Sequence, residues 1–325
     1  MNEFDQLLKT FSSIVLQASP LIIAVCGETI TERAGLINLS LDGTMLLSAM
    51  TGFIVGLQTD SLLLGFLAAA VVGMLFALIV AFGSIRLKQS QVAIGFVLTL
   101  LGDDLSSFLG QNFTRIPGPF VMKAGIPLLE DIPILGPLFF DQDPVVYFAL
   151  LLVGVTWWFL FRTQPGLKLR GVGERPQAAF ARGVKVNRLR YVYALVGGAL
   201  VGIAGAAYSL NVKLGWSEGH TRGLGWIALA IVIFGGWSPV RGAIGAILFG
   251  ATKALATVLQ RTFPEVSVVA FNAIPWILMI AVLVVSTSEL TERFINLAPT
   301  SWRRPLRRFL RVPAPMALGV PFGED

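Results

Sequence analysis

Nine apolar segments divide the chain, and most of them are long enough to cross a lipid bilayer as helices. A transmembrane helix needs about 20 mainly apolar residues. On that scale the segments lie at 11–27, 36–57, 62–83, 91–110, 144–161, 190–210, 223–237, 240–260 and 268–286. Charged residues make up only 14% of the chain, whereas a soluble protein is about 25% charged. The sequence therefore predicts an all-α integral membrane protein, a polytopic helical bundle of eight or nine transmembrane segments, with the short seventh segment as a candidate re-entrant piece.

The charges between the segments predict how the chain is oriented. In the connection 162–190, eight residues are Lys or Arg and Glu174 is the only acid. Short connections rich in Lys and Arg stay on the cytoplasmic side. We therefore expect a transmembrane domain over 1–290, with 162–190 as a cytoplasmic loop, and a basic cytoplasmic tail over 291–325. The connection 111–143 has two bases against four acids and is expected outside. Nine crossings then place the amino terminus outside and the carboxyl terminus in the cytoplasm.

The middle of the basic connection has the pattern of a short helix. Pro176 suits a first helical position, residues 177–182 are mostly good helix formers, and Gly183 can end the helix. A short exposed helix in the largest cytoplasmic loop indicates contact with another protein. Lipid anchoring alone would not require such a helix. We expect a role in topology and lipid contact for the arginines beside the spans, which are Arg162, Arg188 and Arg190.

Two stretches, 33–43 and 220–230, contain glycines typical of a loop and continue into an apolar segment. Discontinuous helices in both halves of a membrane chain are typical of transporters built from two repeats, with the solute path at the repeat interface. The sequence therefore predicts broken helices and an internal repeat.

Ionisable residues inside spans are costly and are functional candidates by default. Asp42, with Asn38 one turn earlier on the same face, and Asp103 in the fourth segment are candidates for lining a translocation path. For Asp42 the alternative is a carboxylate stabilised by the dipole at a helix amino terminus. For Asp103 the alternative is a frayed outer helix end. Lys253 is expected to snorkel or to be paired inside the bundle.

The residue content limits the chemistry that the chain can perform. One cysteine and one histidine, Cys26 and His220, allow no disulfide, no metal cluster and no Cys/His dyad, which argues against an integral membrane enzyme. No Gly-x-x-x-x-Gly-Lys-Ser/Thr phosphate loop is present, so we expect no ATP hydrolysis by this chain and no cofactor. The bases that give the net charge of +6 cluster in the connections. Topology explains them without nucleic acid as a partner.

Three motifs together carry a resemblance to a known family. They are Gly35-Leu-Ile-Asn-Leu-Ser-Leu-Asp-Gly43, Leu169-Arg-Gly-Val-Gly-Glu-Arg-Pro176, and Arg222-Gly-Leu-Gly-Trp-Ile-Ala-Leu-Ala230 with Phe234-Gly-Gly-Trp-Ser-Pro239. They resemble permease subunits of bacterial ABC importers of the ribose and branched-chain amino acid type, in order over most of 11–290. The chain is most similar to the shorter permease of the pair in nucleoside and simple-sugar importers. Family members more often have Gly-Leu-Glu-Gly in the first motif and Glu-Asn-Pro in the second.

This resemblance implies a permease subunit of an ATP-driven importer in the bacterial cytoplasmic (inner) membrane. The solute would be small and polar, a nucleoside or a simple sugar such as ribose. The implied partners are a cytoplasmic ATP-binding cassette ATPase, a second permease subunit and an external solute-binding lipoprotein of the basic-membrane-protein type, besides membrane lipid. Resemblance to one member of a pair implies a heterodimer, while the sequence by itself also permits a homodimer.

The resemblance also identifies the basic connection with the coupling loop of such permeases, whose short helix sits in a groove on the ATPase. The residues carried over to ATPase coupling are Gly166, Arg170, Gly173, Glu174, Arg175, Pro176, Ala178, Ala179, Phe180 and Gly183. The alternative function is a self-sufficient secondary transporter of a small polar solute, which would need a coupling-ion site within this chain.

Overall fold

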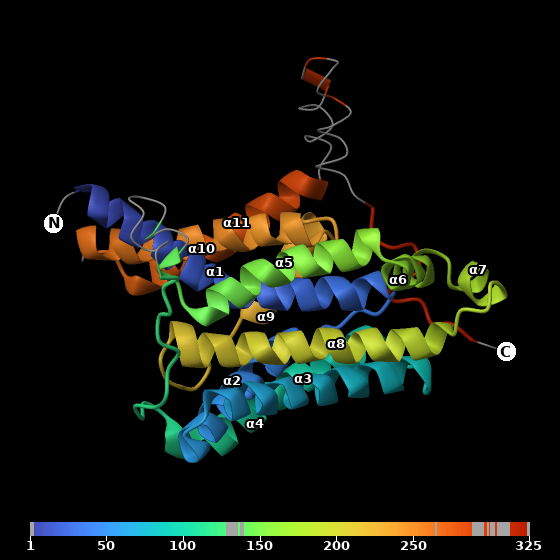
Figure 1. Ribbon diagram of the computed structural model, residues 1–325, viewed down its shortest axis with the longest axis horizontal. Coiled ribbons are helices and arrows are strands. Elements are labelled where there is room, and N and C mark those ends of the chain that lie inside the picture. Colours follow the sequence, from blue (N-terminus) through green and yellow to red (C-terminus); the bar gives the residue numbers. More distant parts are fainter. Residues whose placement is uncertain are drawn as a thin grey trace.

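The computed structural model describes residues 3–127, 136, 140–263, 265–287, 296–297, 299, 303 and 313–323. Across these residues the chain is helical and forms no strand. The helices, in chain order, are α1 (Glu3–Arg33), α2 (Leu41–Thr59), α3 (Leu62–Ile85), α4 (Gln91–Gly110), η1 (Gln111–Phe113), α5 (Pro144–Arg162), α6 (Gln164–Glu174), α7 (Pro176–Ala181), α8 (Val186–Ala207), η3 (Tyr208–Val212), α9 (Leu224–Phe234), α10 (Pro239–Thr262) and α11 (Val268–Thr287). Most of the long helices run along the long axis of the molecule (Figure 1).

Each predicted apolar segment overlaps a helix, with 190–210 extending over α8 and η3, and the predicted all-α polytopic membrane fold is confirmed. Among the described residues, seven stretches are long and apolar enough to cross a membrane, and 224–234 and 273–282 form shorter apolar helices. The expected short seventh segment is α9, which has 11 residues. Large apolar side chains face outward, as at Leu67, Phe96 and Leu151, which are 54%, 51% and 66% exposed. Lipid is the solvent in which such faces are stable.

Several helices begin where the sequence supplies a capping side chain. Ser61 and Asp143 accept hydrogen bonds from the backbone N–H groups of Leu64 and Val146, at the starts of α3 and α5. Thr163 does the same for Gly166 at the start of α6. These contacts satisfy amide groups that have no partner inside the helix.

Close helix contacts in the centre of the bundle depend on glycine. Gly198 of α8 lies against Gly73 of α3. A β-carbon added to Gly73 would lie 2.0 Å from the Gly198 carbonyl oxygen. The adjacent Gly197 lies against Gly27 of α1, and a β-carbon added to Gly27 would lie 2.7 Å from the Gly197 carbonyl oxygen. Small residues let helix backbones approach each other in membranes. Helix α8 is therefore packed between α1 and α3.

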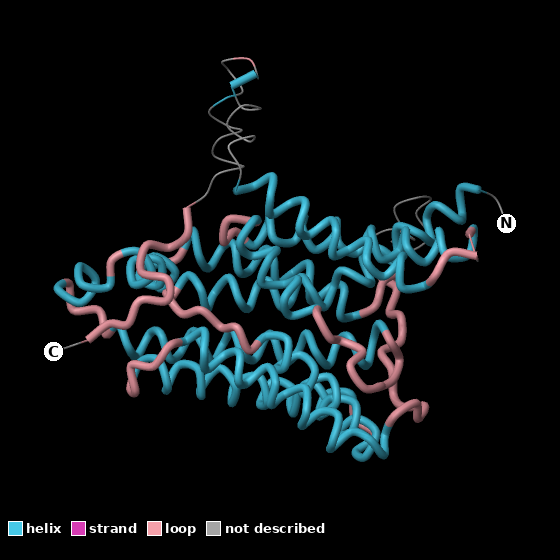
Figure 2. Tube along the Cα trace, turned by 180° about the vertical axis from the view of Figure 1, so that it is seen from behind, coloured by secondary structure: helices cyan, strands magenta, loops and turns pink. Residues whose placement is uncertain are grey.

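The two ends of the bundle differ. Helices α6 and α7 project at one end, together with the carboxyl-terminal residues, and the amino terminus lies at the opposite end (Figure 1). The same arrangement is seen from behind in Figure 2, where loops lie at both ends. The predicted short helix is confirmed as α7, and Gly183 follows it with a φ of +79°. Sequence reasoning missed α6. Most of the predicted basic tail 291–325 lies outside the described residues, as do 128–135 and 137–139 of the predicted outer connection.

Candidate functional site

The two glycine-containing stretches predicted from the sequence meet in the structure. Asp42 lies in the first turn of α2 and is 4% exposed. Its Oδ1 accepts hydrogen bonds from the backbone N–H groups of Gly223, at 2.8 Å, and Gly225, at 2.9 Å. Gly223 has a φ of +90°, and a β-carbon at Gly225 would lie 2.2 Å from the Asp42 nitrogen. Glycine at both positions lets the start of α9 reach the start of α2.

Asn38 organises the connection between α1 and α2. Its Oδ1 accepts a hydrogen bond from the Ser40 N–H at 3.1 Å, and its own N–H donates to Glu28 Oε1 at 3.3 Å. Thr99 of α4 holds the same connection through its hydroxyl, which donates to the Leu39 carbonyl at 2.8 Å. Asn38 is 2% exposed. Neither Asn38 nor Asp42 lines the cavity described below, and their place on the translocation path stays a prediction.

Two buried carboxyl groups that sequence reasoning missed lie beside this connection. Glu28 and Glu32 of α1 are 0% and 2% exposed. Glu28 accepts from Asn38, and Glu32 accepts from the indole N–H of Trp237, which follows α9. Two acids four residues apart share one helix face. This pair can be recognised from the sequence only if the first helix is predicted to continue beyond residue 27. The apolar run ends there, whereas the helix continues to Arg33.

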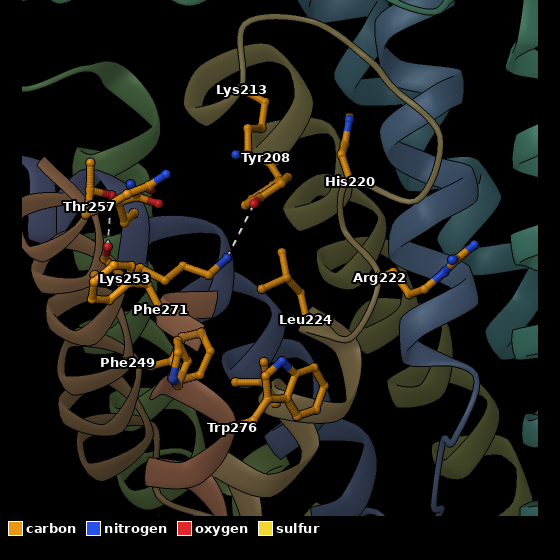
Figure 3. Close-up of a pocket in the computed structure, with 15 residues that line it drawn as sticks. Tyr208, Lys213, His220, Arg222, Leu224, Phe249, Lys253, Thr257, Phe271 and Trp276 are labelled. Atoms are coloured by element: carbon orange, nitrogen blue, oxygen red, sulfur yellow. Dashed lines mark hydrogen bonds between the residues drawn. The ribbon is translucent and has the colours of Figure 1, made fainter. Parts of the chain in front are cut away.

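A cavity of about 340 Å³ opens between α1, η3, the loop before α9, α9, α10 and α11 (Figure 3). It is lined by the aromatic residues Tyr208, Phe249, Phe271 and Trp276, by Lys213, His220, Arg222 and Lys253, by Gln17, Thr257 and Gln260, and by Leu224, Ile227, Ala256 and Pro275. Small-molecule sites range over roughly 300–1,000 Å³. The lining residues of α10 lie between Phe249 and Gln260, away from the end of the helix that follows Trp237. The cavity therefore lies toward the amino-terminal end of the bundle.

Lys253 extends across the cavity from α10 toward Tyr208 (Figure 3). Its Nζ lies 3.4 Å from the Tyr208 hydroxyl, 5.2 Å from the centre of the Tyr208 ring and 5.8 Å from that of Phe249. In the part of the chain that the structure describes, Lys253 forms no ion pair. The contact is a cation–π arrangement. Because an ammonium group has three N–H donors, this side chain can also donate to a bound molecule.

His220 contributes a neutral ring to the same cavity. Its ring centre lies 5.6 Å from that of Tyr208, and its Nδ1 accepts a hydrogen bond from the Ser217 N–H at 2.9 Å. Burial and the charge of Lys213 lower the pKa of His220 to about 4. The ring is therefore uncharged at pH 7, and the Ser217 contact leaves the single ring proton on Nε2.

Asp103 approaches the cavity through an ion pair. One guanidinium nitrogen of Arg222 lies 2.9 and 3.0 Å from the two carboxylate oxygens of Asp103. The carboxylate raises the pKa of Arg222 above its ordinary value. Arg222 also lines the cavity. Of the three residues predicted for the translocation path, Asp103 is thus the one tied directly to a cavity side chain, and its role in transport stays a prediction.

At the opposite end, the residues carried over to ATPase coupling fall into buried and exposed groups. A β-carbon at Gly166 would lie 2.0 Å from the Phe159 carbonyl oxygen, and one at Gly173 would lie 2.2 Å from that of Arg33. These two glycines and the buried Pro176 hold α6 and α7 against the bundle. The Arg170 guanidinium stacks 5.1 Å from the Phe161 ring. The exposed members of the set are Arg175, Ala178, Phe180 and Gly183, while Glu174 and Ala179 are half-buried.

A groove of about 710 Å³ runs along this surface. It is lined by Leu167, Lys168, Gly171, Glu174, Arg175, Ala178, Ala179, Arg182, Val184 and Met316. Three of these residues are basic and one is acidic, while most of the others are apolar. The groove therefore combines apolar side chains with a net positive charge.

Arg190 does not have the lipid-facing position expected from the sequence. It is 1% exposed, its Nε donates to the Ala34 carbonyl at 3.2 Å and its Nη1 donates to the Val320 carbonyl at 3.0 Å. The physical reason is that α8 begins at Val186, so Arg190 already lies inside the helix, beside the carbonyl groups of Ala34, which follows α1, and Val320, near the carboxyl terminus. Arg162 and Arg188 are exposed.

Comparisons with known proteins agree on the family of the chain. Residues 10–283 match the family described as branched-chain amino acid transport system / permease component. A putative glucose ABC transporter permease protein of Haloferax volcanii is 40% identical over 248 residues, covering 75% of each chain. A guanosine ABC transporter permease protein of Bacillus subtilis is 35% identical over 288 residues, covering 83% of this chain and 89% of that protein.

A nucleoside ABC transporter permease protein of Lactococcus lactis is 32% identical over 269 residues, covering 79% of this chain and 85% of that protein. Haloferax volcanii has another glucose ABC transporter permease protein, which is 26% identical over 254 residues, covering 73% of this chain and 67% of that protein. No solved structure is significantly similar to the chain.

Proposed function

The chain belongs to the family of branched-chain amino acid transport system permease components, and we propose that it carries a nucleoside or a simple sugar across the bacterial cytoplasmic membrane as one subunit of an ATP-driven importer. The observation that carries this proposal is the family match over 10–283, together with relatives named for glucose, guanosine and nucleoside transport. The family is one of transporter components, so the chain is a permease and not an enzyme. The solute and the partners are what we propose beyond that.

The cavity supports this choice of solute class. Nucleosides and sugars are uncharged and present flat or apolar faces together with many hydrogen-bonding groups. The rings of Trp276 and Phe271 offer aromatic faces, while Lys253, Thr257 and Gln260 offer polar groups in the same space. Pockets of this composition use apolar walls for affinity and a few polar groups for orientation.

We place the α7 end in the cytoplasm and the amino-terminal end outside. The eight bases of 162–190 support this orientation, because Lys and Arg accumulate on the cytoplasmic side. The cavity then opens in the outer half of the bundle, where a binding lipoprotein would deliver solute. The α6–α7 surface then meets the ATPase, with the exposed Ala178 and Phe180 available for contact and basic residues available to pair with acids on the partner.

We also propose a heterodimer with a second permease subunit. Haloferax volcanii has two glucose permease proteins, and this chain is 40% identical to one and 26% identical to the other. The difference in identity supports a role for this chain as one of two non-identical permease subunits. The proposed importer therefore contains this chain, a second permease, an ATPase and an external lipoprotein of the basic-membrane-protein type.

Reconstitution tests the proposal. Proteoliposomes containing this chain, the second permease and the ATPase should take up radiolabelled guanosine or glucose when ATP and the binding lipoprotein are supplied. Liposomes that contain this chain alone should take up neither solute, with or without a proton or sodium gradient. Gradient-driven uptake by the chain alone would refute the assignment in favour of a secondary transporter.

A further inference from the structure

The residues 313–323 return to the α7 end and pack there as a strap. The Ala317 N–H donates to the Gly173 carbonyl at 2.9 Å, and the Gly319 N–H donates to the Gly35 carbonyl at 3.0 Å. The Met316 N–H donates to the Glu174 carboxylate at 3.3 Å. Figure 1 shows the carboxyl terminus at the same end of the bundle as α6 and α7. Backbone hydrogen bonds thus join the strap to α6 and to the connection between α1 and α2.

The side chains of the strap join the same elements. Phe322 is 7% exposed and packs with the buried Val172 of α6 and Val186 of α8. Its ring lies edge-on to that of Phe180, with ring centres 5.7 Å apart. Ala179 of α7 packs against the same cluster. Aromatic pairs with this geometry add to the effect of apolar burial. One phenylalanine of the strap therefore links α7 to two other helices.

The strap also satisfies a buried charge. The Arg190 guanidinium donates to Ala34 and to Val320 of the strap, while its Nη2 has no hydrogen-bond partner among the described residues. Loss of the strap would leave a second guanidinium nitrogen without a protein partner. Removing one partner of a buried charged group costs more than losing an ordinary hydrogen bond. The strap is therefore better suited to remain in place than to be displaced.

Met316 places the strap on the groove. Its side chain is 72% exposed and lines the groove together with Ala178 of α7 and Leu167 of α6. Lys168, Arg175 and Arg182 lie along the same groove. An apolar groove lined by three basic side chains fits an apolar and acidic surface on a cytoplasmic partner.

We propose that the strap is part of the ATPase docking surface: it holds α7 against the bundle, and Met316 forms one wall of the groove that the ATPase contacts. This inference rests on the proposed function, in which the α6–α7 surface receives the ATPase. It adds a segment from the far end of the sequence to that surface. The competing arrangement is an inhibitory plug that the ATPase displaces.

A pair of matched substitutions in the strap tests the proposal. Met316→Asp adds a charge at the groove wall, whereas Val320→Asp adds the same charge at a strap side chain that is 46% exposed and does not line the groove. Both side chains are exposed, so both variants should fold. In the purified permease complex, Met316→Asp should weaken ATPase binding about tenfold, or 1.4 kcal/mol, and Val320→Asp should leave it within about twofold. Equal binding by the two variants would overturn the inference.

A third variant separates failure of the strap from failure of the proposed function. Ala178→Asp changes an exposed groove residue of α7 that lies outside the strap. If Ala178→Asp releases the ATPase and Met316→Asp does not, the coupling surface stands and the strap is no part of it. If neither variant weakens binding, the ATPase docks elsewhere and the proposed coupling surface fails as well.

Hydrogen exchange distinguishes the strap as a wall from the strap as a plug. The amides of Ala317 and Gly319 donate to backbone carbonyls, so they should exchange slowly in the free permease. We expect the same or greater protection when the ATPase is bound. Faster exchange in the complex, or tighter ATPase binding after truncation at residue 312, would show a displaced plug and contradict the proposal.

Discussion

Asp42 joins the start of α2 to the start of α9, and its replacement gives a quantitative prediction. One carboxylate oxygen, Oδ1, accepts two backbone hydrogen bonds, from Gly223 and Gly225, in a site where Asp42 is 4% exposed. Asp42→Ala removes the acceptor and leaves two buried N–H groups unpaired. Hydrogen bonds to charged groups contribute about 1.5–3 kcal/mol each. We expect Asp42→Ala to lower the free energy of unfolding by about 3–6 kcal/mol.

Asp42→Asn is the matched control for this loss. Its amide keeps an oxygen in the same place, so both backbone contacts can persist, at roughly half the strength of charge-assisted bonds. We therefore expect a loss of about half that of the alanine variant, with α9 still held to α2. Denaturation of the purified protein in detergent, followed by tryptophan fluorescence, measures both variants.

The same two variants separate a structural role from a role in lining the solute path. A structural Asp42 predicts that Asp42→Asn retains most uptake and that Asp42→Ala loses uptake in proportion to its loss of folded protein. If the Asp42 carboxylate instead lines the solute path, Asp42→Asn should have normal stability and strongly reduced uptake. If Asp42→Asn were as stable as the native chain but inactive, our reasoning from the hydrogen bonds would be refuted.

The other predictions concern the cavity, the orientation and the coupling end. Lys253→Met should raise the KM for solute about tenfold, the effect of losing one charged hydrogen bond, and unchanged uptake kinetics would remove Lys253 from the site. In a Cys26→Ala background, an impermeant maleimide applied to intact cells should label Asn112→Cys and not Gln177→Cys, and the opposite pattern would invert the topology. The pKa of His220 is lowered to about 4, so the unfolded chain binds a proton more readily below pH 6.5. Stability should therefore fall between about pH 6.5 and 4 in the native protein and fall less in His220→Gln. Glu174→Gln should change stability by at most about 1 kcal/mol, because its ion pair is partly exposed, yet lower the solute taken up per ATP hydrolysed. Unchanged stoichiometry would exclude it from coupling.

The sequence predicts the membrane-spanning elements well because their signal is local. In lipid, the backbone N–H and C=O groups of an apolar run must form hydrogen bonds with each other, and a helix provides these bonds. The run itself therefore predicts the helix, as it does for the short α9. Helix α7 can be predicted for a similar reason, since Pro176 and Gly183 mark its two ends. The amphipathic α6 is harder to detect, because its Gln164–Glu174 sequence contains three glycines and lies within a polar connection.

The contacts that build the site are not local and cannot be read from a run of residues. The cavity combines Gln17 of α1 with Lys253 of α10 and Trp276 of α11, which are far apart in the sequence. Arg190 looks like a lipid anchor from its place beside a span, but its partners are carbonyl groups of Ala34 and Val320. The burial of Arg190 depends on how segments distant in the sequence pack around it, and hydropathy does not predict that packing.

The arrangement provides a continuous series of contacts from the coupling surface to the cavity. Glu174 of α6 lies 3.8 Å from the Arg33 guanidinium, and Arg33 in turn donates to the Trp237 carbonyl at 3.0 Å. The connection that follows Arg33 leads into α2, where Asp42 in the first turn holds the start of α9, and Leu224 of α9 lines the cavity. If ATP-driven motion of α7 reaches the cavity by this route, Glu174→Gln and Asp42→Asn should have non-additive effects on uptake per ATP, because substitutions at coupled sites do not act independently. Additive effects would mean that the two contacts act independently, and the coupling would then have to pass through another part of the bundle, such as α8 with its buried Arg190.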